Sequence, residues 1–124
     1  MSDESTKFWP IEIRVQSEEK RLEIEFDNGE AFSIPAELLR VESPSAEVQG
    51  HGPGQETLVL GKQQVMITAV EPIGQYAIRL VFDDGHDTGL YTWKYLRELG
   101  AEHATRWTAY LQKVRDRLRS GSGT

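Results

Sequence analysis

The chain contains no cysteine among its 124 residues. This absence excludes disulfide bonds, thiolate nucleophiles, thiolate zinc sites and iron–sulfur clusters that the chain would ligate by itself. No apolar run approaches the roughly 18 residues that a membrane-spanning helix needs. The acidic, polar start MSDESTKFW does not resemble a signal peptide. We therefore expect a cytoplasmic protein with no membrane partner.

Positive charge is also scarce, because 14 Lys and Arg oppose 20 Asp and Glu and the net charge is −6. A nucleic-acid-binding surface needs an excess of cations, so nucleic acid is not an expected partner. The motifs GxGxxG, GxSxG and HExxH and the P-loop are absent from the sequence, which leaves no signature of a nucleotide site or a common hydrolase. The 3 Trp, 4 Tyr and 4 Phe are enough to build the core of one small domain.

Alternation of apolar and polar residues is typical of half-buried strands. It predicts six strands, at 11–16, 21–26, 31–34, 64–70, 76–82 and 88–91. Pro35 is expected to open a short helical turn over 36–41. Thr92 is the expected N-cap of a helix that Gly100 stops, and an apolar stripe at helical spacing predicts a second helix over 102–118.

These elements predict a single α+β domain, in which a mostly antiparallel sheet packs against two C-terminal helices. The domain is expected over 9–118, with flexible tails at 1–8 and 119–124. A weak internal echo supports this architecture, since LxIxFDNG at 22–29 matches IxLxFDDG at 78–85. Convergence on a common strand–turn–strand–helix unit and internal duplication both explain the echo. Either origin implies two hairpin-plus-helix units that share one sheet.

Two polar segments stand out as candidate sites. The stretch DDGHDT at 83–88 places His86 among three carboxylates, which suits either acid–base or metal chemistry, or a plain hairpin turn with solvated carboxylates. The segment 43–57 is too rich in Gly and Pro for regular structure and is therefore expected to be a long loop, which contains His51.

These two segments also carry a family resemblance. LRVESPSAE at 39–47, QGHGPG at 49–54 and FDDGHDTGLYTWKYL at 82–96 resemble DUF971, a family of stand-alone bacterial proteins of unknown function. That family is similar to the N-terminal domain of gamma-butyrobetaine hydroxylase and trimethyllysine hydroxylase. A related module resembles the C-terminal extension of plant P-loop ATPases that carry iron–sulfur clusters.

The resemblance implies a lost zinc site. In the hydroxylases this domain holds a structural zinc through a Cys-rich motif and one His, and the corresponding positions here are Ser43, Ser45, about Val48, and His86. A serine hydroxyl is a poor zinc ligand, so we expect no cofactor and a hydrogen bond from His86 to Ser43 or Ser45. A weaker site that joins His86 to Glu47 and His51 is the alternative. The hydroxylases' catalytic barrel is a separate domain, and the chain ends before one could begin, so we expect no hydroxylase activity.

We interpret the chain as a non-catalytic binding or adaptor module for an unknown protein partner, acting through the 43–54 loop and the 86–91 segment. It has no expected catalytic residue and no expected metal ligand, and His86 is the main candidate for a ligand if a metal site survives. The alternatives are a metal-linked accessory factor, for example in iron–sulfur cluster assembly, and an enzyme that uses His86 with its neighbouring carboxylates. The candidate binding residues are Ser43, Ser45, Glu47, His51, His86, Asp87, Thr88 and Tyr91.

Cations crowd the end of the last predicted helix, at Lys113, Arg115, Arg117 and Arg119. One explanation is that they complement the negative end of the helix dipole. The other is a docking patch for an acidic partner or RNA.

Overall fold

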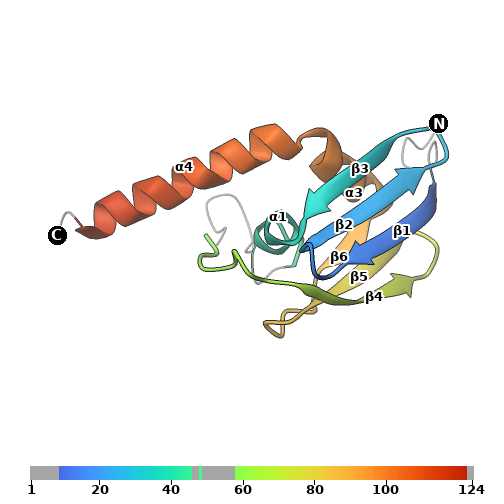
Figure 1. Ribbon diagram of the computed structural model, residues 1–124, viewed down its shortest axis with the longest axis horizontal. Helices are drawn as coiled ribbons and strands as arrows, with labels where there is room; N and C mark the ends of the chain where they lie inside the picture. The colour runs from blue at the N-terminus through green and yellow to red at the C-terminus, as the bar shows by residue number, and fades with distance from the viewer. Residues whose placement is uncertain (1–8, 46–47, 49–57, 123–124) are drawn as a thin grey trace.

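The computed structural model describes residues 9–45, 48 and 58–122, and Figure 1 shows their arrangement. The strands and helices, in chain order, are β1 Pro10–Gln16, β2 Arg21–Phe26, β3 Ala31–Pro35, α1 Ala36–Val41, β4 Ile67–Ile73, β5 Ala77–Phe82, β6 Leu90–Thr92, α3 Trp93–Ala101 and α4 His103–Ser122. This order confirms the predicted α+β class with two C-terminal helices.

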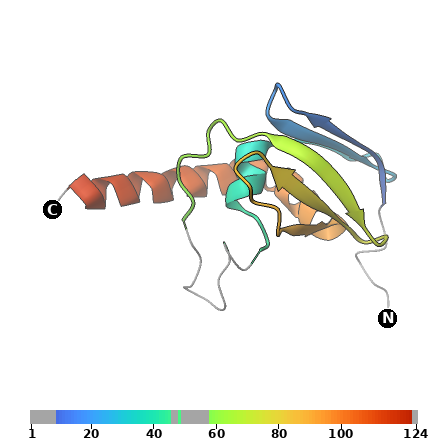
Figure 2. The same ribbon diagram turned by 90° about the horizontal axis from the view of Figure 1, so that it is seen from below.

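The strands form two antiparallel sheets, not the single shared sheet that the echo predicted. Their orders are β1-β2-β3 and β4-β5-β6, and Figure 2 shows the β1–β2 and β4–β5 hairpins as separate layers. The sheets meet where the Ser17 hydroxyl donates to the Ile67 carbonyl at 3.0 Å. Alternation in a sequence specifies which side chains face the core, but it does not specify which strand edges share backbone hydrogen bonds.

The two echoed segments close their hairpins in the same way. Phe26 donates to the Glu30 carbonyl at 2.8 Å and Gly29 to the Phe26 carbonyl at 3.1 Å, while Phe82 donates to the carbonyl of His86 at 3.0 Å and Gly85 to that of Phe82 at 3.1 Å. Both glycines have φ near +90°, which side chains with a Cβ rarely adopt. The predicted turns are confirmed, and each leads through a return strand into a helix.

The core lies between the central strands of the two sheets and the helices α1 and α3. Alternate residues of β2 and β5 point into it and are at most 3% exposed: Leu22, Ile24, Phe26, Ile78, Leu80 and Phe82. Several residues of the C-terminal helices pack against this core, as their spacing predicts: Trp93, Tyr95, Leu96, Leu99, Trp107, Leu111 and Val114. Among the described residues, no helix is long and apolar enough to cross a membrane.

Strand β4 differs from its prediction. It runs from Ile67 to Ile73 and passes through Pro72, where the sequence predicted a break. Proline lacks a backbone donor, which an edge strand tolerates, and β4 is an edge strand of its sheet. The strand predicted from residue 76 begins at Ala77 instead, because Tyr76 lies in the β4–β5 turn and is 56% exposed.

The helix boundaries confirm one predicted cap and correct another. The Thr92 side chain accepts a hydrogen bond from the Tyr95 backbone N–H at 3.1 Å, as an N-cap should. Gly100 does not stop α3, which continues to Ala101, and its φ is not positive. Helix α4 continues to Ser122, four residues past the predicted end, where a flexible tail was expected.

Gly100 is required by close packing rather than by helix termination. A Cβ atom at this position would lie 2.4 Å from Cγ and 2.7 Å from Cβ of Phe32 on β3. Those Phe32 atoms are next to the backbone, so they cannot move aside without shifting the strand.

We therefore expect Gly100→Ala to lower the free energy of unfolding by about 1–2 kcal/mol, because overpacking outweighs the gain of about 1 kcal/mol in helix propensity. Urea denaturation is the measurement. Phe32→Ala removes the Cγ atom, so in a double-mutant cycle Gly100→Ala and Phe32→Ala together should cost less than the sum of the two single changes. A stabilised Gly100→Ala variant would contradict the close approach.

Candidate functional site

The centre of the candidate site is a buried contact between Ser43, just beyond α1, and His86, just beyond β5. Oγ of Ser43 lies 2.9 Å from Nε2 of His86, within hydrogen-bond distance. Ser43 is 0% exposed and His86 6%. The predicted hydrogen bond between these residues is confirmed.

A second hydrogen bond lies beside the first. The Thr88 hydroxyl donates to Oγ of Ser45 at 2.9 Å, and the backbone N–H of Ser45 donates to Oγ of Ser43 at 3.3 Å. We call Ser43, Ser45 and His86 the polar base. The base joins the end of α1 to the β5–β6 connection, which lies more than forty residues further along the chain.

Gly89 permits this close approach. A Cβ atom there would lie 2.5 Å from Oγ of Ser43 and 3.0 Å from Cε1 of Tyr91. No sequence pattern singled out Gly89, whose only signal was its position inside the HDTGLY segment.

Tyr91 lies beneath the polar base rather than at its surface. It is 0% exposed, and its hydroxyl donates to the Leu39 carbonyl at 2.6 Å. Burial raises the pKa of this phenol far above its ordinary value, so Tyr91 is neutral. It ties β6 to α1 from within the core.

Tyr95 makes a similar tie to the residue that follows α1. Its hydroxyl donates to the Glu42 carbonyl, and burial, together with the nearby Glu42 carboxylate, raises its pKa to about 12. Arg106 of α4 lies over the Tyr95 ring, 5.7 Å from its centroid, and pairs with the Glu42 carboxylate at 3.0 Å. Helices α3 and α4 therefore both hold the chain where it leaves α1.

Asp84 is the main electrostatic anchor of the site. Its Oδ2 lies 2.8 Å from Nε of Arg40 and 2.7 Å from Nζ of Lys62, and its Oδ1 accepts the His86 backbone N–H at 3.0 Å. Partial burial raises the pKa of Asp84, but the hydrogen bonds from Lys62, the His86 backbone and Arg40 outweigh it and lower the pKa to about 2. Asp84 is therefore ionised at neutral pH.

The two cations on Asp84 come from opposite sides of the predicted loop. Arg40 precedes the segment 43–57 in the chain and Lys62 follows it, so the Asp84 carboxylate holds the chain on both sides of this segment. Nη1 of Arg40 is buried and has no hydrogen-bond partner within the described part of the chain. Neither Arg40 nor Lys62 was selected from the sequence, because their shared partner is distant from both.

The other two carboxylates of the DDGHDT stretch also have structural contacts. Oδ1 of Asp83 accepts the Met66 backbone N–H at 3.0 Å, and Oδ2 of Asp87 lies 3.5 Å from Nη1 of Arg79. The interactions of these carboxylates fit the hairpin-turn interpretation of the stretch.

The residues present do not fit the structural zinc that the resemblance implies. Ser43 and Ser45 offer hydroxyls, Val48 has no donor atom, and Nε2 of His86 lies against Ser43. No group of three metal-ligating side chains occurs among residues 9–45, 48 and 58–122. Glu47 and His51 lie outside the described residues, so their roles stay predictions.

A hollow of about 270 Å³ lies elsewhere, on the outer face of the β1-β2-β3 sheet. Glu12, Arg14, Glu23 and Glu25 line it, and Arg14 pairs with Glu23 at 2.8 Å and with Glu12 at 3.1 Å. It shares no residue with the polar base.

The structure defines a small α+β domain in which hydrogen bonds join the end of α1 to the β5–β6 connection. The sequence of this domain matches a family model. Residues 13–97 match the model described as gamma-butyrobetaine hydroxylase-like, N-terminal. The chain therefore belongs to that domain family, and the resemblance read from its motifs is confirmed. No curated protein matches the chain.

Three solved structures are similar over most of the chain. Two NMR solution structures are each 46% identical, with TM-scores of 0.79 and 0.74, and the matches cover 94% and 86% of this chain and 86% and 84% of theirs. A crystal structure from Acidithiobacillus ferrooxidans, of a DUF971 protein of unknown function, is 40% identical with a TM-score of 0.65 and covers 82% of this chain and 100% of its own.

We expect Ser43→Ala to lower the free energy of unfolding by about 1–3 kcal/mol, because it leaves a buried imidazole nitrogen without its partner. Ser33→Ala, on the exposed face of β3, is the matched control and should change stability by less than about 0.5 kcal/mol. In a double-mutant cycle, Ser43→Ala and His86→Ala together should cost less than the sum of the two single changes. Additive losses would contradict a direct contact.

Asp84→Asn should lower the free energy of unfolding at neutral pH by about 1.5–3 kcal/mol, as expected for hydrogen bonds to a charged group. The folded-state pKa of about 2 lies below the ordinary value of 3.8, so the stabilisation is present above pH 3.8 and is lost as the pH falls toward 2. Denaturant titrations across this pH range should show the unfolding free energies of wild type and variant converging as the pH falls. Asp116→Asn on the exposed face of α4 is the control and should leave the pH dependence of the unfolding free energy unchanged. If Asp84→Asn were still less stable than wild type at pH 2, the lowered pKa of Asp84 would be refuted.

Proposed function

We propose that this chain is a non-catalytic binding module that recognises a protein partner through the surface above the polar base. We define the rim as the solvent-accessible side chains of the 86–91 segment, Asp87, Thr88 and Leu90, which follow His86 of the polar base along the chain. Thr88 is exposed and Leu90 is 41% exposed. The predicted surface also includes the 46–54 stretch, which lies largely outside the described residues.

The observation that carries this proposal is the closed, buried hydrogen bonding of the polar base. Ser43 and His86 lie against each other, Ser43 fully buried and His86 only 6% exposed, and Thr88 is fixed by its bond to Ser45. Binding residues commonly lie on segments that a rigid scaffold positions. The base supplies such a scaffold for the rim.

The same observation weighs against catalysis. A serine oxygen 2.9 Å from a histidine nitrogen resembles a nucleophile with its base, but Ser43 is 0% exposed and no substrate can reach it without local opening. Asp84, whose carboxylate accepts the His86 backbone N–H, is also held by two cations. It is therefore poorly placed to act as an acid or base.

In vivo photocrosslinking tests the rim directly. A photoreactive residue at Leu90 should give one discrete crosslinked adduct with a protein, while the same residue at Ile11 should not. Ile11 is a suitable control because it is also an exposed aliphatic residue on a strand, at 62% exposure. Leu90→Ser should then weaken binding of the identified partner at least about tenfold, with unfolding free energy changed by less than about 0.5 kcal/mol.

Two outcomes would overturn the proposal. One is no adduct at Leu90, and the other is the same adducts at Leu90 and Ile11, which would indicate non-specific contact. Loss of binding together with loss of stability would assign the residue to the scaffold rather than to recognition.

A metal-linked accessory role is the alternative, and elemental analysis of untagged protein distinguishes it. We expect less than stoichiometric zinc, because hydroxyls and a valine stand at the positions that thiolates would need. One zinc per chain that disappears in His86→Ala would favour the metal-linked role.

A further inference from the structure

Helix α4 extends well beyond the body of the domain. Its first half is held, because Tyr110 is 6% exposed and its hydroxyl donates to the Val59 carbonyl at 3.1 Å. Figures 1 and 2 both show the second half projecting past the sheets. Leu118, in this projecting part, is 62% exposed. We call residues 113–119 the α4 tip.

The apolar residues of α4 continue into the tip with coiled-coil spacing. Trp107, Leu111, Val114 and Leu118 follow one another at steps of four, three and four residues. This is the alternation of the a and d positions in a heptad, whose apolar seam packs against another helix. The body covers the start of the seam, while Leu118 at its end faces solvent.

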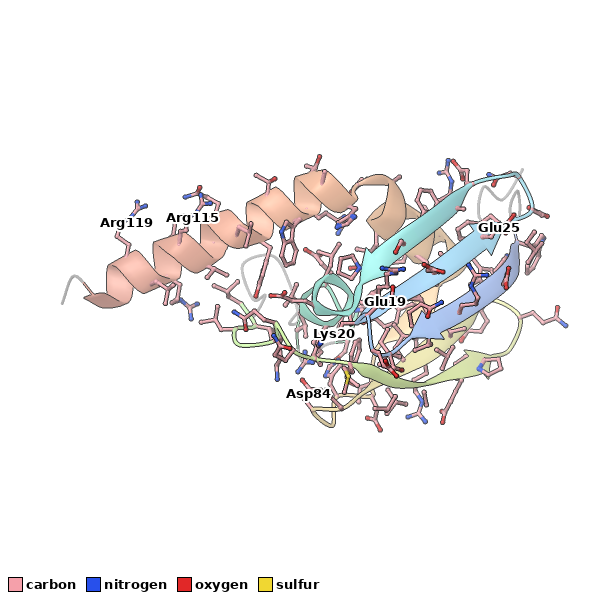
Figure 3. The ribbon with its side chains drawn as sticks, in the orientation of Figure 1. Glu19, Lys20, Glu25, Asp84, Arg115 and Arg119 are labelled. Atoms are coloured by element: carbon pink, nitrogen blue, oxygen red, sulfur yellow. The ribbon has the colours of Figure 1, made fainter. Side chains whose placement is uncertain are left out.

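Two arginines flank the exposed end of the seam. With Val114 at d and Leu118 at a, Arg115 takes position e and Arg117 takes position g. Charges at e and g select the partner of a coiled coil, because they face the partner's own flanking residues. Figure 3 shows Arg115 and Arg119 pointing outward from α4.

The helix dipole does not account for these cations. Its effect is limited to about the last turn, whereas Lys113 and Arg115 lie nine and seven residues before the end of α4 at Ser122. The tip also places like charges at i, i+4 twice, in 113/117 and 115/119, each of which destabilises a helix by about 0.2–0.5 kcal/mol. Asp116 is the only acidic residue in the tip, and it accepts a hydrogen bond from Gln112 at 2.9 Å.

We propose that the α4 tip is a second interaction surface, which docks an amphipathic acidic helix of a partner protein. The partner's apolar side chains pack on Val114 and Leu118, and its carboxylates pair with Arg115 and Arg117. The proposal is independent of the rim, because the tip lies at the far end of α4 from the polar base. Asp84, next to the base, and Arg119, in the tip, mark this separation in Figure 3.

Other occupants fit these observations less well. Two copies of the tip would bring Arg115 and Arg117 against their own counterparts, because the flanks carry one sign only. A membrane surface needs a broad apolar face, and Leu118 is the one large apolar side chain exposed on the described tip. RNA would make no use of Leu118, and the chain as a whole has a net charge of −6.

The test uses two synthetic three-heptad peptides with Leu at a and d, one with Glu and one with Lys at e and g. Titration into the isotopically labelled full chain, followed by backbone NMR shifts, should show binding of the Glu peptide with changes confined to 111–122. Raising the salt concentration should weaken this binding, because the paired charges are at the surface. The Lys peptide should not bind.

Two charge-reversed variants separate the seam geometry from overall charge. Arg115→Glu with Arg117→Glu reverses the seam flanks, and Lys113→Glu with Arg119→Glu makes the same charge change away from the seam. Each double variant converts both like-charge i, i+4 pairs into opposite-charge pairs. The second variant also places glutamates three residues from Asp116 on either side, so circular dichroism of both variants is the control for helix content. We expect the first to weaken Glu-peptide binding about tenfold and to gain binding of the Lys peptide, and the second to weaken it less than about threefold. Leu118→Ser should also weaken binding.

Several results would overturn the proposal. If the two double variants weakened binding of the Glu peptide equally, the α4 tip would act only as a general cationic patch. Binding of vesicles of equal parts phosphatidylglycerol and phosphatidylcholine that depends on Arg115 and Arg117, without Glu-peptide binding, would assign the tip to membranes. A concentration-dependent dimer that Leu118→Ser abolishes would assign it to self-association, and binding of a single-stranded RNA oligomer that does not depend on Leu118 would assign it to nucleic acid.

Discussion

Burial of polar groups where the β5–β6 connection meets the end of α1 is the constraint on which the rest of this structure depends. A polar group that leaves water must find a hydrogen-bond partner in the fold. Ser43 and His86 satisfy one another there, Thr88 reaches Ser45, and Tyr91 donates to the Leu39 carbonyl. Because partners come from distant parts of the chain, the contacts fix the two halves of the domain relative to each other.

Asp84 extends this join to the segment between the halves. Arg40 and Lys62 flank that segment in the chain, and both bind the same carboxylate. The Asp84 carboxylate therefore brings together the two ends of this segment through ion pairs, without a metal–thiolate cluster. A firm base of this kind suits a binding module, and the projecting α4 gives the domain a second face that is physically separate from the first. Together the two faces fit the adaptor interpretation.

Some features were predictable because they depend on neighbouring residues. The turns at Gly29 and Gly85 follow from residues that accept positive φ, and the Thr92 cap follows from a side chain that bonds three residues ahead. The contact between Ser43 and His86 was predicted from the family resemblance, since neither spacing nor periodicity relates residues 43 positions apart. Arg40, Lys62 and Gly89 were missed because their importance lies in distant partners.

The sequence by itself determined the local elements, the faces that they bury and the absence of thiolate chemistry, because these depend on periodicity, short-range bonding and residue type. The tertiary structure decided that the strands form two sheets and that Pro72 is tolerated at a sheet edge. It decided as well that Gly100 allows close packing against Phe32 rather than ending a helix. It also decided that Tyr91 is internal while Leu118 is exposed. Each of these depends on which distant surfaces pack together, and a pattern of apolar residues is compatible with several such packings.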